Sequence, residues 1–225
     1  MVTLSILDPH LKKGQLWYDE NNFMDKKTRT TFTYNHSAKD FAKMFDTGKP
    51  RSRDINNAFE LRGKKNPLVL EVGSGSGRDA KEILKQTNRY IGIDIAEHMV
   101  EIAKKKVPKG RFIQADIESF VYPKRLDIIF AFDSLLHICV HALEKFFQNA
   151  HTNLNKDGII YISMKTGPYH EETHVDCYGI RTFYFYEMEE VETLTAELFD
   201  IVYQEERSFD DEARFVMAFK KKEVC

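Results

Sequence analysis

The chain has 225 residues, of which 42% are hydrophobic and 30% are charged, so it is long enough and apolar enough for one globular domain with a sizeable core. Its formal net charge of -2 at pH 7 argues against a protein built mainly to neutralise nucleic-acid phosphates. Its 3 cysteines are too few for a disulfide framework, and no long apolar segment predicts a signal peptide or a membrane span. These features predict a cytoplasmic protein without a membrane partner.

The first part of the chain is polar and irregular. Residues 36–62 have helical spacing in two pieces, and we expect them to form a helical cap at one end of a sheet. Residues 1–35 show no regular pattern. We therefore expect an N-terminal arm and helical cap over residues 1–66, followed by the main unit over residues 67–225.

Residues 67–164 alternate short apolar runs with helical patterns, which predicts an α/β fold with a parallel sheet. The tail differs, because a helix at 187–198 precedes two strand-like runs joined by the turn 208–211, which predicts an antiparallel hairpin. The expected fold is a Rossmann-like, mostly parallel, seven-stranded sheet with helices on both faces, a C-terminal hairpin and an N-terminal helical cap. The expected strands are 68–72, 90–94, 111–115, 126–130, 159–163, 201–207 and 214–220, and the helices between them are 77–86, 96–107 and 143–154.

A glycine-rich turn, Gly73-Ser74-Gly75-Ser76-Gly77, follows the first predicted strand. Glycines let the backbone turn tightly and let a ligand approach it, and the next helix points its N-terminal N–H groups at that ligand. The spacing G-x-G-x-G differs from the dinucleotide fingerprint G-x-G-x-x-G. The turn alone indicates a nucleotide-type loop, and an NAD-dependent dehydrogenase stays an alternative.

Acidic side chains lie at the ends of the first three predicted strands. Asp94, after the second strand, can accept hydrogen bonds from both ribose hydroxyls, which disfavours the 2′-phosphate of NADP. Asp116, after the third, can bracket an adenine ring together with the backbone of Ile117. Glu71, inside the first strand, would repel a pyrophosphate but suits a cofactor with a cationic amino group and a sulfonium. Unless Glu71 only accepts N–H groups of the turn, these residues favour S-adenosyl-methionine as the cofactor.

Several motifs resemble those of the class I S-adenosyl-methionine-dependent methyltransferases, over roughly residues 36–220. The resemblance is closest to small bacterial members of uncertain substrate. The fifth motif departs mildly, because Lys156 and Asp157 stand where the family usually has Pro-Gly-Gly. The motifs, in order, are the turn from Glu71 to Asp79, Gly92-Ile93-Asp94 with Met99, Gln114-Ala115-Asp116-Ile117, Asp127 to His137, and Asn155-Lys156-Asp157-Gly158.

The resemblance implies which residues contact the cofactor. Phe132, after the fourth strand, is expected near its methionine moiety. The implied cofactor residues are Glu71, Gly73, Ser74, Gly75, Gly77, Arg78, Asp94, Ile95, Met99, Asp116, Ile117 and Phe132.

Four other residues, His137, Lys165, Arg181 and Tyr184, are candidates to face the methyl acceptor. His137 lies just past the fourth strand, where the methyl group is expected, although it could instead cap the next helix. Lys165 follows the fifth strand and, with Arg181, could bind an anionic acceptor, although it could equally be a solvated loop lysine. Tyr184 is expected in the same cleft. Residues 169–177, which include two histidines, are expected to form a mobile loop over the strand ends and not a metal site.

Methyl transfer from a sulfonium needs mainly an in-line approach of the acceptor, so positioning supplies most of the catalysis. The fourth strand ends in Phe132-Asp133-Ser134-Leu135 and lacks the Asn/Asp-Pro-Pro-Tyr motif for methylating base amino groups. The sequence therefore predicts S-adenosyl-methionine-dependent methyl transfer to a small, anionic metabolite. Two alternatives stay open: an RNA or protein acceptor held by the arm 1–35, and a non-catalytic cofactor-binding module. The oligomeric state is not predicted.

Overall fold

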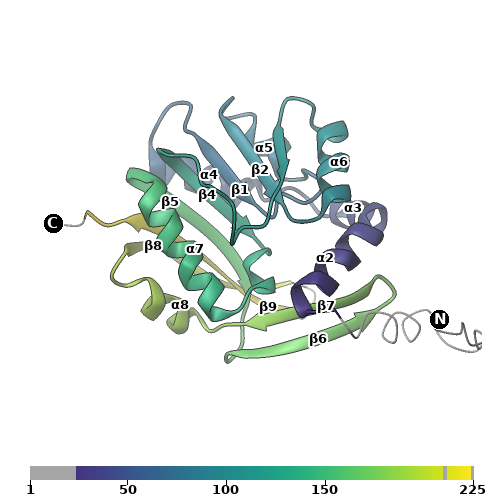
Figure 1. Ribbon diagram of the computed structural model, residues 1–225. Coiled ribbons are helices and arrows are strands. Elements are labelled where there is room, and N and C mark those ends of the chain that lie inside the picture. Colours follow the sequence, from purple (N-terminus) through teal and green to yellow (C-terminus); the bar gives the residue numbers. More distant parts are fainter. Residues whose placement is uncertain (1–23, 210–211, 224–225) are drawn as a thin grey trace, which may run out of the picture.

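The structure is a computed structural model that describes residues 24–209 and 212–223. In this part of the chain, seven strands form one sheet in the order β3-β2-β1-β4-β5-β9-β8 (Figure 1). Strands β1 to β5 pair in parallel, and β9 pairs antiparallel with β5 and β8, which confirms the predicted fold class. The strands are β1 (Val69–Val72), β2 (Tyr90–Asp94), β3 (Arg111–Gln114), β4 (Leu126–Phe132), β5 (Leu154–Lys165), β8 (Phe199–Phe209) and β9 (Glu212–Lys221).

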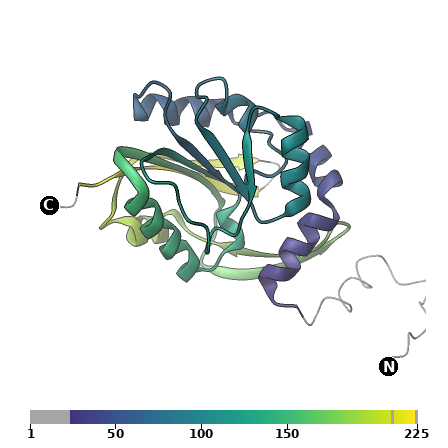
Figure 2. The same cartoon turned by 45° about the horizontal axis from the view of Figure 1, so that its top comes forward.

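Helices cover both faces of this sheet (Figure 2). On one face, α4, α5 and α6 bury side chains such as Ile55 and Val100. On the other face, α7 and α8 bury side chains such as Phe147 and Val191. Each fully buried side chain of this size contributes about 1.5–3 kcal/mol. The helices are α2 (Lys26–His36), α3 (Ala38–Thr47), α4 (Ser52–Arg62), α5 (Ala80–Ile83), α6 (Glu97–Lys106), α7 (Val140–Asn153) and α8 (Met188–Thr195), with one 3-10 turn, η1 (Leu135–His137).

Two helices differ from the sequence-based expectation. The helix expected at 77–86 is only the four residues of α5, because Gly77 has a left-handed backbone (φ 78) and the chain turns back at Thr87, whose hydroxyl donates to the carbonyl of Pro67. The helix α2 lies in the segment for which no pattern was found. Where the chain is described, no helix is long and apolar enough to cross a membrane.

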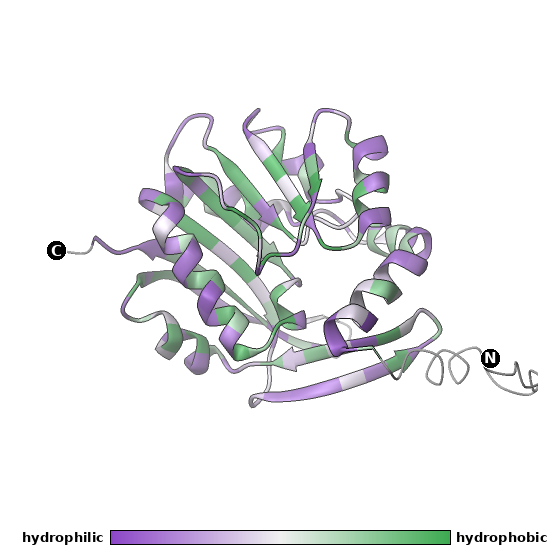
Figure 3. Cartoon of the chain, in the orientation of Figure 1, coloured by the Kyte–Doolittle hydropathy of each residue, from purple (hydrophilic) through white to green (hydrophobic). Residues whose placement is uncertain are grey.

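The segment expected to be a loop over 169–177 is instead part of a second, two-stranded sheet made of β6 (His170–Asp176) and β7 (Gly179–Phe185). The strand β6 is largely exposed and hydrophilic (Figure 3), so it lacks the apolar alternation by which a strand is recognised. Its partner β7 buries Ile180 and Phe183 and anchors the hairpin. Figure 1 shows α2 lying along this hairpin, close to the ends of the parallel strands.

A buried carboxylate, Asp127, joins the N-terminal ends of the strands at the side of the sheet away from the glycine turn. Its side chain is 0% exposed and accepts hydrogen bonds from Arg62, Lys64, Asn155 and the N–H group of Leu68, at 2.8–2.9 Å. Burial raises the pKa of Asp127, but these hydrogen bonds, that of Lys64 first, outweigh it and hold the pKa at about 2. The carboxylate thus fastens the segment before β1 to β4 and to the start of β5.

We expect Asp127→Ala to lower the free energy of unfolding by about 3 kcal/mol, because its loss leaves Arg62, with 13% of its side chain exposed, without a counter-ion. Urea unfolding at pH 7 measures this loss. The exposed Asp200, which lies 3.6 Å from Nζ of Lys222, is the matched control, and Asp200→Ala should change the stability far less. Equal effects of the two substitutions would show that Asp127 is not a structural centre.

Candidate cofactor and acceptor site

The turn after β1 leaves no room for a side chain at its first glycine. Gly73 has a left-handed backbone (φ 69), and an added Cβ would lie 2.3 Å from the Cβ of Ser134 in the turn after β4. The hydroxyl of Ser134 donates to the carbonyl of Val72 at 2.9 Å, and the N–H groups of Gly73 and Ser74 donate to the carbonyl of Ile93. The ends of β1, β2 and β4 are therefore held together at this point.

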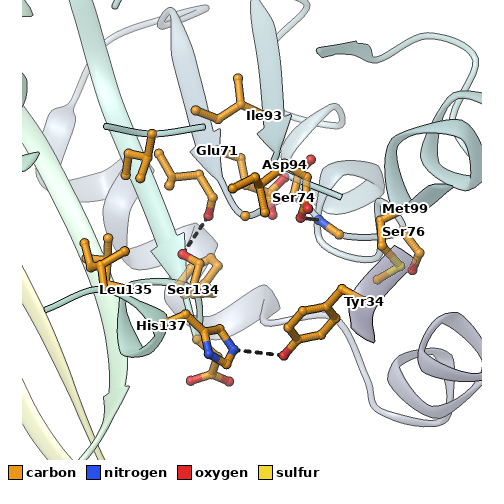
Figure 4. A pocket seen from close by; sticks show the side chains of 18 of the residues that line it. Tyr34, Glu71, Ser74, Ser76, Ile93, Asp94, Met99, Ser134, Leu135 and His137 are labelled. Atoms are coloured by element: carbon orange, nitrogen blue, oxygen red, sulfur yellow. Dashed lines mark hydrogen bonds between the residues drawn. The ribbon is translucent and has the colours of Figure 1, made fainter. Parts of the chain in front are cut away.

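A cavity of about 370 Å³ opens beside this turn. Figure 4 shows Glu71, Ser74 and Asp94 on one side of it, and Tyr34 and His137 facing each other across from them. Of the predicted cofactor residues, Gly77 alone does not line the cavity, because it packs against α6 and β3. The others line it: Glu71, Gly73, Ser74, Gly75, Arg78, Asp94, Ile95, Met99, Asp116, Ile117 and Phe132.

Asp94 organises the turn from the end of β2. Its two carboxylate oxygens accept the N–H groups of Gly75 at 2.9 Å and of Ala96 at 2.8 Å. Burial raises the pKa of Asp94, and these two hydrogen bonds oppose that rise. Asp116, after β3, accepts the N–H group of Glu118 and pairs with Lys27 of α2, so the cap reaches this end of the cavity.

Glu71 is almost completely buried at the cavity wall, where the hydroxyl of Tyr90 donates to it. Burial and the charge of Asp79 raise its pKa to about 8, and the hydrogen bond from Tyr90 and the charge of Arg51 only partly oppose this. Glu71 therefore holds a proton at neutral pH when no cation lies beside it.

A chain of alternating charges, not anticipated from the sequence, runs along the cavity from α4 to β9. Arg51 donates to Asp79 at 2.9 Å, pairs with Asp133, and lies over the ring of Phe132 at 5.1 Å. Asp133, just after β4, also pairs with Arg214 of β9 at 2.6 Å. Their sequence signals were weak, because Arg51 and Arg214 lie far from the motifs that mark the strand ends.

His137 has both ring nitrogens occupied. Nδ1 lies 2.7 Å from the carbonyl of Thr182, and Nε2 lies 2.9 Å from the hydroxyl of Tyr34. Because a carbonyl can only accept, Nδ1 carries the proton and Nε2 accepts the hydrogen bond of Tyr34. Burial, together with the positive charges of Arg181 and Lys165, lowers the pKa of His137 to about 4. The imidazole is therefore neutral at pH 7, with its basic nitrogen on the side of Tyr34.

The other three predicted acceptor residues do not line the cavity. Lys165 donates to Glu212 at 2.7 Å, with its Nζ 4.8 Å from the centre of the Phe183 ring. Arg181 pairs with Asp176. Tyr184 packs at the edge of the α7 core, opposite Glu171 in β6. Their proposed role in acceptor binding stays a prediction.

The free edge of β7 is covered by side chains and not by a strand. The hydroxyl of Thr33 donates to the carbonyl of Ile180 at 2.7 Å and accepts its N–H group at 3.0 Å. The hydroxyl of Thr30 accepts the N–H group of Thr182, and that of Ser37 donates to the carbonyl of Tyr178. These spacings place the three hydroxyls on one face of the helical segment. They dock α2 on the hairpin and carry Tyr34 to His137.

Polar groups at the ends of neighbouring parallel strands, set around a glycine turn, define a Rossmann-like protein with a nucleoside-type cavity. Residues 69–158 match the family model of a methyltransferase domain. This segment of the chain is therefore a methyltransferase domain, and the fold around it is that of the class I S-adenosyl-methionine-dependent methyltransferases.

Two curated relatives illustrate the range of this similarity. The chain is 33% identical over 76 residues to trans-aconitate 2-methyltransferase of Acidovorax sp. (strain JS42), which covers 33% of this chain and 30% of the relative. It is 29% identical over 121 residues to phosphoethanolamine N-methyltransferase of Plasmodium falciparum, which covers 52% of this chain and 45% of the relative. The chain thus spans less than half the length of these two relatives. A ribosomal RNA small subunit methyltransferase also occurs among the matches.

A solved structure matches nearly the whole chain. It is the 1,6-didemethyltoxoflavin-N1-methyltransferase of Burkholderia thailandensis, which contains 1,6-didemethyltoxoflavin and S-adenosylhomocysteine. The TM-score is 0.67 at 20% identity, and the match covers 96% of this chain and 94% of that one. At this identity the match shows the shared fold.

The cavity of this chain suits the S-adenosyl-methionine that the family uses. The side-chain oxygen of Ser76 lines it, is buried and has no hydrogen-bond partner within the described residues, so a ligand can supply one. Glu71 and Asp94 offer acidic oxygens to a cationic ligand and to hydroxyl groups.

Binding of this cation should release protons from Glu71. At pH 7 we expect wild-type protein to release on the order of one proton more per bound S-adenosyl-methionine than Glu71→Gln does, because the cation favours the ionised carboxylate. The release is measured by calorimetry at one pH in buffers of different ionisation enthalpy. Glu60→Gln, on the exposed side of α4, is the control and should behave like wild type. Equal release by wild type and Glu71→Gln would contradict a protonated Glu71.

Loss of the hydroxyl of Thr33 should loosen α2 from β7. In Thr33→Val the amide proton of Ile180 should exchange faster, by about tenfold for a loss near 1.4 kcal/mol, because both peptide groups of Ile180 lose a buried partner. Thr33→Ser should keep the protection. Thr193→Val is the control, since the hydroxyl of Thr193 bonds only the carbonyl of Glu189 in its own helix. Unchanged exchange in Thr33→Val would contradict the docking.

Proposed function

We propose that this protein transfers the methyl group of S-adenosyl-methionine to a small, anionic metabolite. The observation that carries the proposal is the position of His137 and Tyr34 at one end of the cavity whose other side is formed by the glycine turn and the acidic strand ends. Cofactor residues and a neutral base thus share one space. A bound sulfonium would supply an activated methyl group there.

The cofactor residues then have distinct roles. We assign Asp94 to the ribose hydroxyls, and Asp116 with the backbone of Ile117 to the adenine. Glu71 would hold the cationic amino group. Arg51, which lies over the ring of Phe132, is the cation best placed for the carboxylate of the methionine moiety. The first three assignments follow from the sequence motifs, and the last comes from the charge chain along the cavity.

The base is needed when the acceptor starts as a hydroxyl or an amine. Bound S-adenosyl-methionine would supply the methyl group and leave as S-adenosyl-homocysteine, and Nε2 of His137 would accept the proton that the acceptor atom loses. For this to occur, the hydroxyl of Tyr34 must give up its hydrogen bond to Nε2 or relay the proton. The carbonyl of Thr182 stabilises the resulting imidazolium through Nδ1.

Two features support a small acceptor. The cavity, about 370 Å³, is at the lower end of the roughly 300–1,000 Å³ of small-molecule sites. The helix α2 contributes Lys27, Thr30, Thr31 and Tyr34 to its wall, so the chain itself covers the ends of the strands. A base in RNA or a side chain of a folded protein would have to displace that helix.

An anionic acceptor is supported by cations near His137. Arg214 lines the cavity, and Lys165 is its cross-strand partner on β5. The trans-aconitate and phosphoethanolamine named for the two relatives both carry acidic groups. These observations favour a carboxylate or a phosphate on the acceptor.

We expect His137→Gln to lower kcat by about 100-fold, since general-base assistance typically supplies that much or more, while the affinity for S-adenosyl-methionine stays unchanged. The measurement is S-adenosyl-homocysteine formation with a panel of small carboxylates and phosphate esters. His151→Gln, a histidine of α7 remote from the cavity, is the control and should leave kcat unchanged. Full activity in His137→Gln would remove the histidine from the reaction, and absence of S-adenosyl-methionine binding would overturn the function.

A further inference from the structure

Two cations lie opposite each other where β5 and β9 pair. Lys165 and Arg214 are direct cross-strand partners in this antiparallel pair. Like charges in such positions repel, so the pair requires an anion between them. Glu212, the first residue of β9, supplies it: one carboxylate oxygen lies 2.7 Å from Nζ of Lys165 and the other 2.8 Å from Nη2 of Arg214.

The three side chains differ in exposure. Lys165 and Arg214 are largely covered, with 11% and 20% of their side chains exposed, whereas the side chain of Glu212 is 48% exposed. A buried lysine is costly without a counter-ion, but an exposed carboxylate can turn into water at little cost. Glu212 is therefore the replaceable member of the cluster.

The cation pair borders the acceptor end of the cavity. The second amino group of Arg214, Nη1, faces Asp133 inside the cavity. The ring of Phe183 is close to both Lys165 and His137: its centre is 4.8 Å from Nζ of Lys165 and 4.8 Å from the centre of the imidazole. An anion on this pair would thus lie near the ring that also contacts the base.

We propose that Lys165 and Arg214 form the subsite for the acceptor's carboxylate or phosphate group, and that Glu212 occupies this subsite until the acceptor displaces it. The inference rests on the proposed function and deepens it, because it names the residues that select an anionic acceptor. A neutral analogue cannot replace Glu212, because Lys165 would then lose its counter-ion while Arg214 kept only its pair with Asp133. Because Glu212 competes for the two cations, only an acceptor with an anionic group can displace it.

Inorganic phosphate and acetate are the probes, each titrated at constant ionic strength into protein labelled at arginine Nε, with the Nε signal of Arg214 as the readout. In Glu212→Gln we expect phosphate, acetate or both to bind at least about fivefold more tightly than in wild type, because the competing carboxylate no longer occupies the subsite. Lys165→Met should remove the binding gained in Glu212→Gln when both substitutions are combined. Glu206→Gln, an exposed carboxylate on β8, is the matched control and should equal wild type.

The relative affinities identify the source of the anion: tighter phosphate indicates a phosphate ester, and tighter acetate a carboxylate. No gain in affinity for either probe in Glu212→Gln would overturn the proposal, and so would a gain that survives Lys165→Met. Thermal unfolding of each variant checks that it is folded, and Lys165→Arg, which keeps the charge, should retain binding. S-adenosyl-methionine titrated into the same samples separates the two failures. Cofactor binding without an anion subsite refutes only this inference, whereas absence of cofactor binding refutes the proposed function.

Discussion

The site depends on the contact between the turns after β1 and β4. Gly73 and Ser134 approach so closely that a single added carbon atom would collide, and the hydroxyl of Ser134 fastens the end of β1. The apolar strands β2, β1 and β4 lie side by side in the sheet, so their ends have no freedom to separate. The polar side chains that follow these strand ends therefore line one common cavity. Asp94 and Glu71 both line that cavity because the close contact between the turns holds the ends of their strands together.

Charge shapes this cavity as much as packing does. The cations Arg51 and Arg214 are each held by carboxylates, so neither is a loose surface charge. Glu71, in contrast, has no ion-pair partner of this kind among the described residues, because burial raises its pKa and keeps the carboxyl group neutral until a cation binds beside it. A positively charged methyl donor would ionise Glu71 and pair with it. The acidic group that still needs a counter-ion therefore lies on the donor side of the cavity. The side that we propose for the acceptor is instead rich in cations, with Lys165 beside Arg214.

The parallel sheet could be predicted from the sequence because its strands are continuous apolar runs, and the acids at their ends follow directly from the strand positions. Tyr34 could not, because its helix buries Thr30 and Thr33, and threonine is a weak helix former that leaves no apolar stripe. The β6–β7 hairpin could not be predicted for a related reason, since β6 is exposed along most of its length. Arg214 reaches the cavity only through antiparallel pairing of β9 with β5, a neighbour relation that no local motif encodes.

The hydroxyls that dock α2 on β7 have a consequence for self-association. A strand edge with open peptide groups readily pairs with a strand of another molecule. Here Thr30, Thr33 and Ser37 take up those groups, so the helix shields the hairpin as well as the cavity. If α2 moves away from the hairpin during ligand exchange, the free edge of β7 is open to pairing with another strand for as long as the exchange lasts. Ligand occupancy and resistance to aggregation would then rise and fall together, through one short threonine-rich helix.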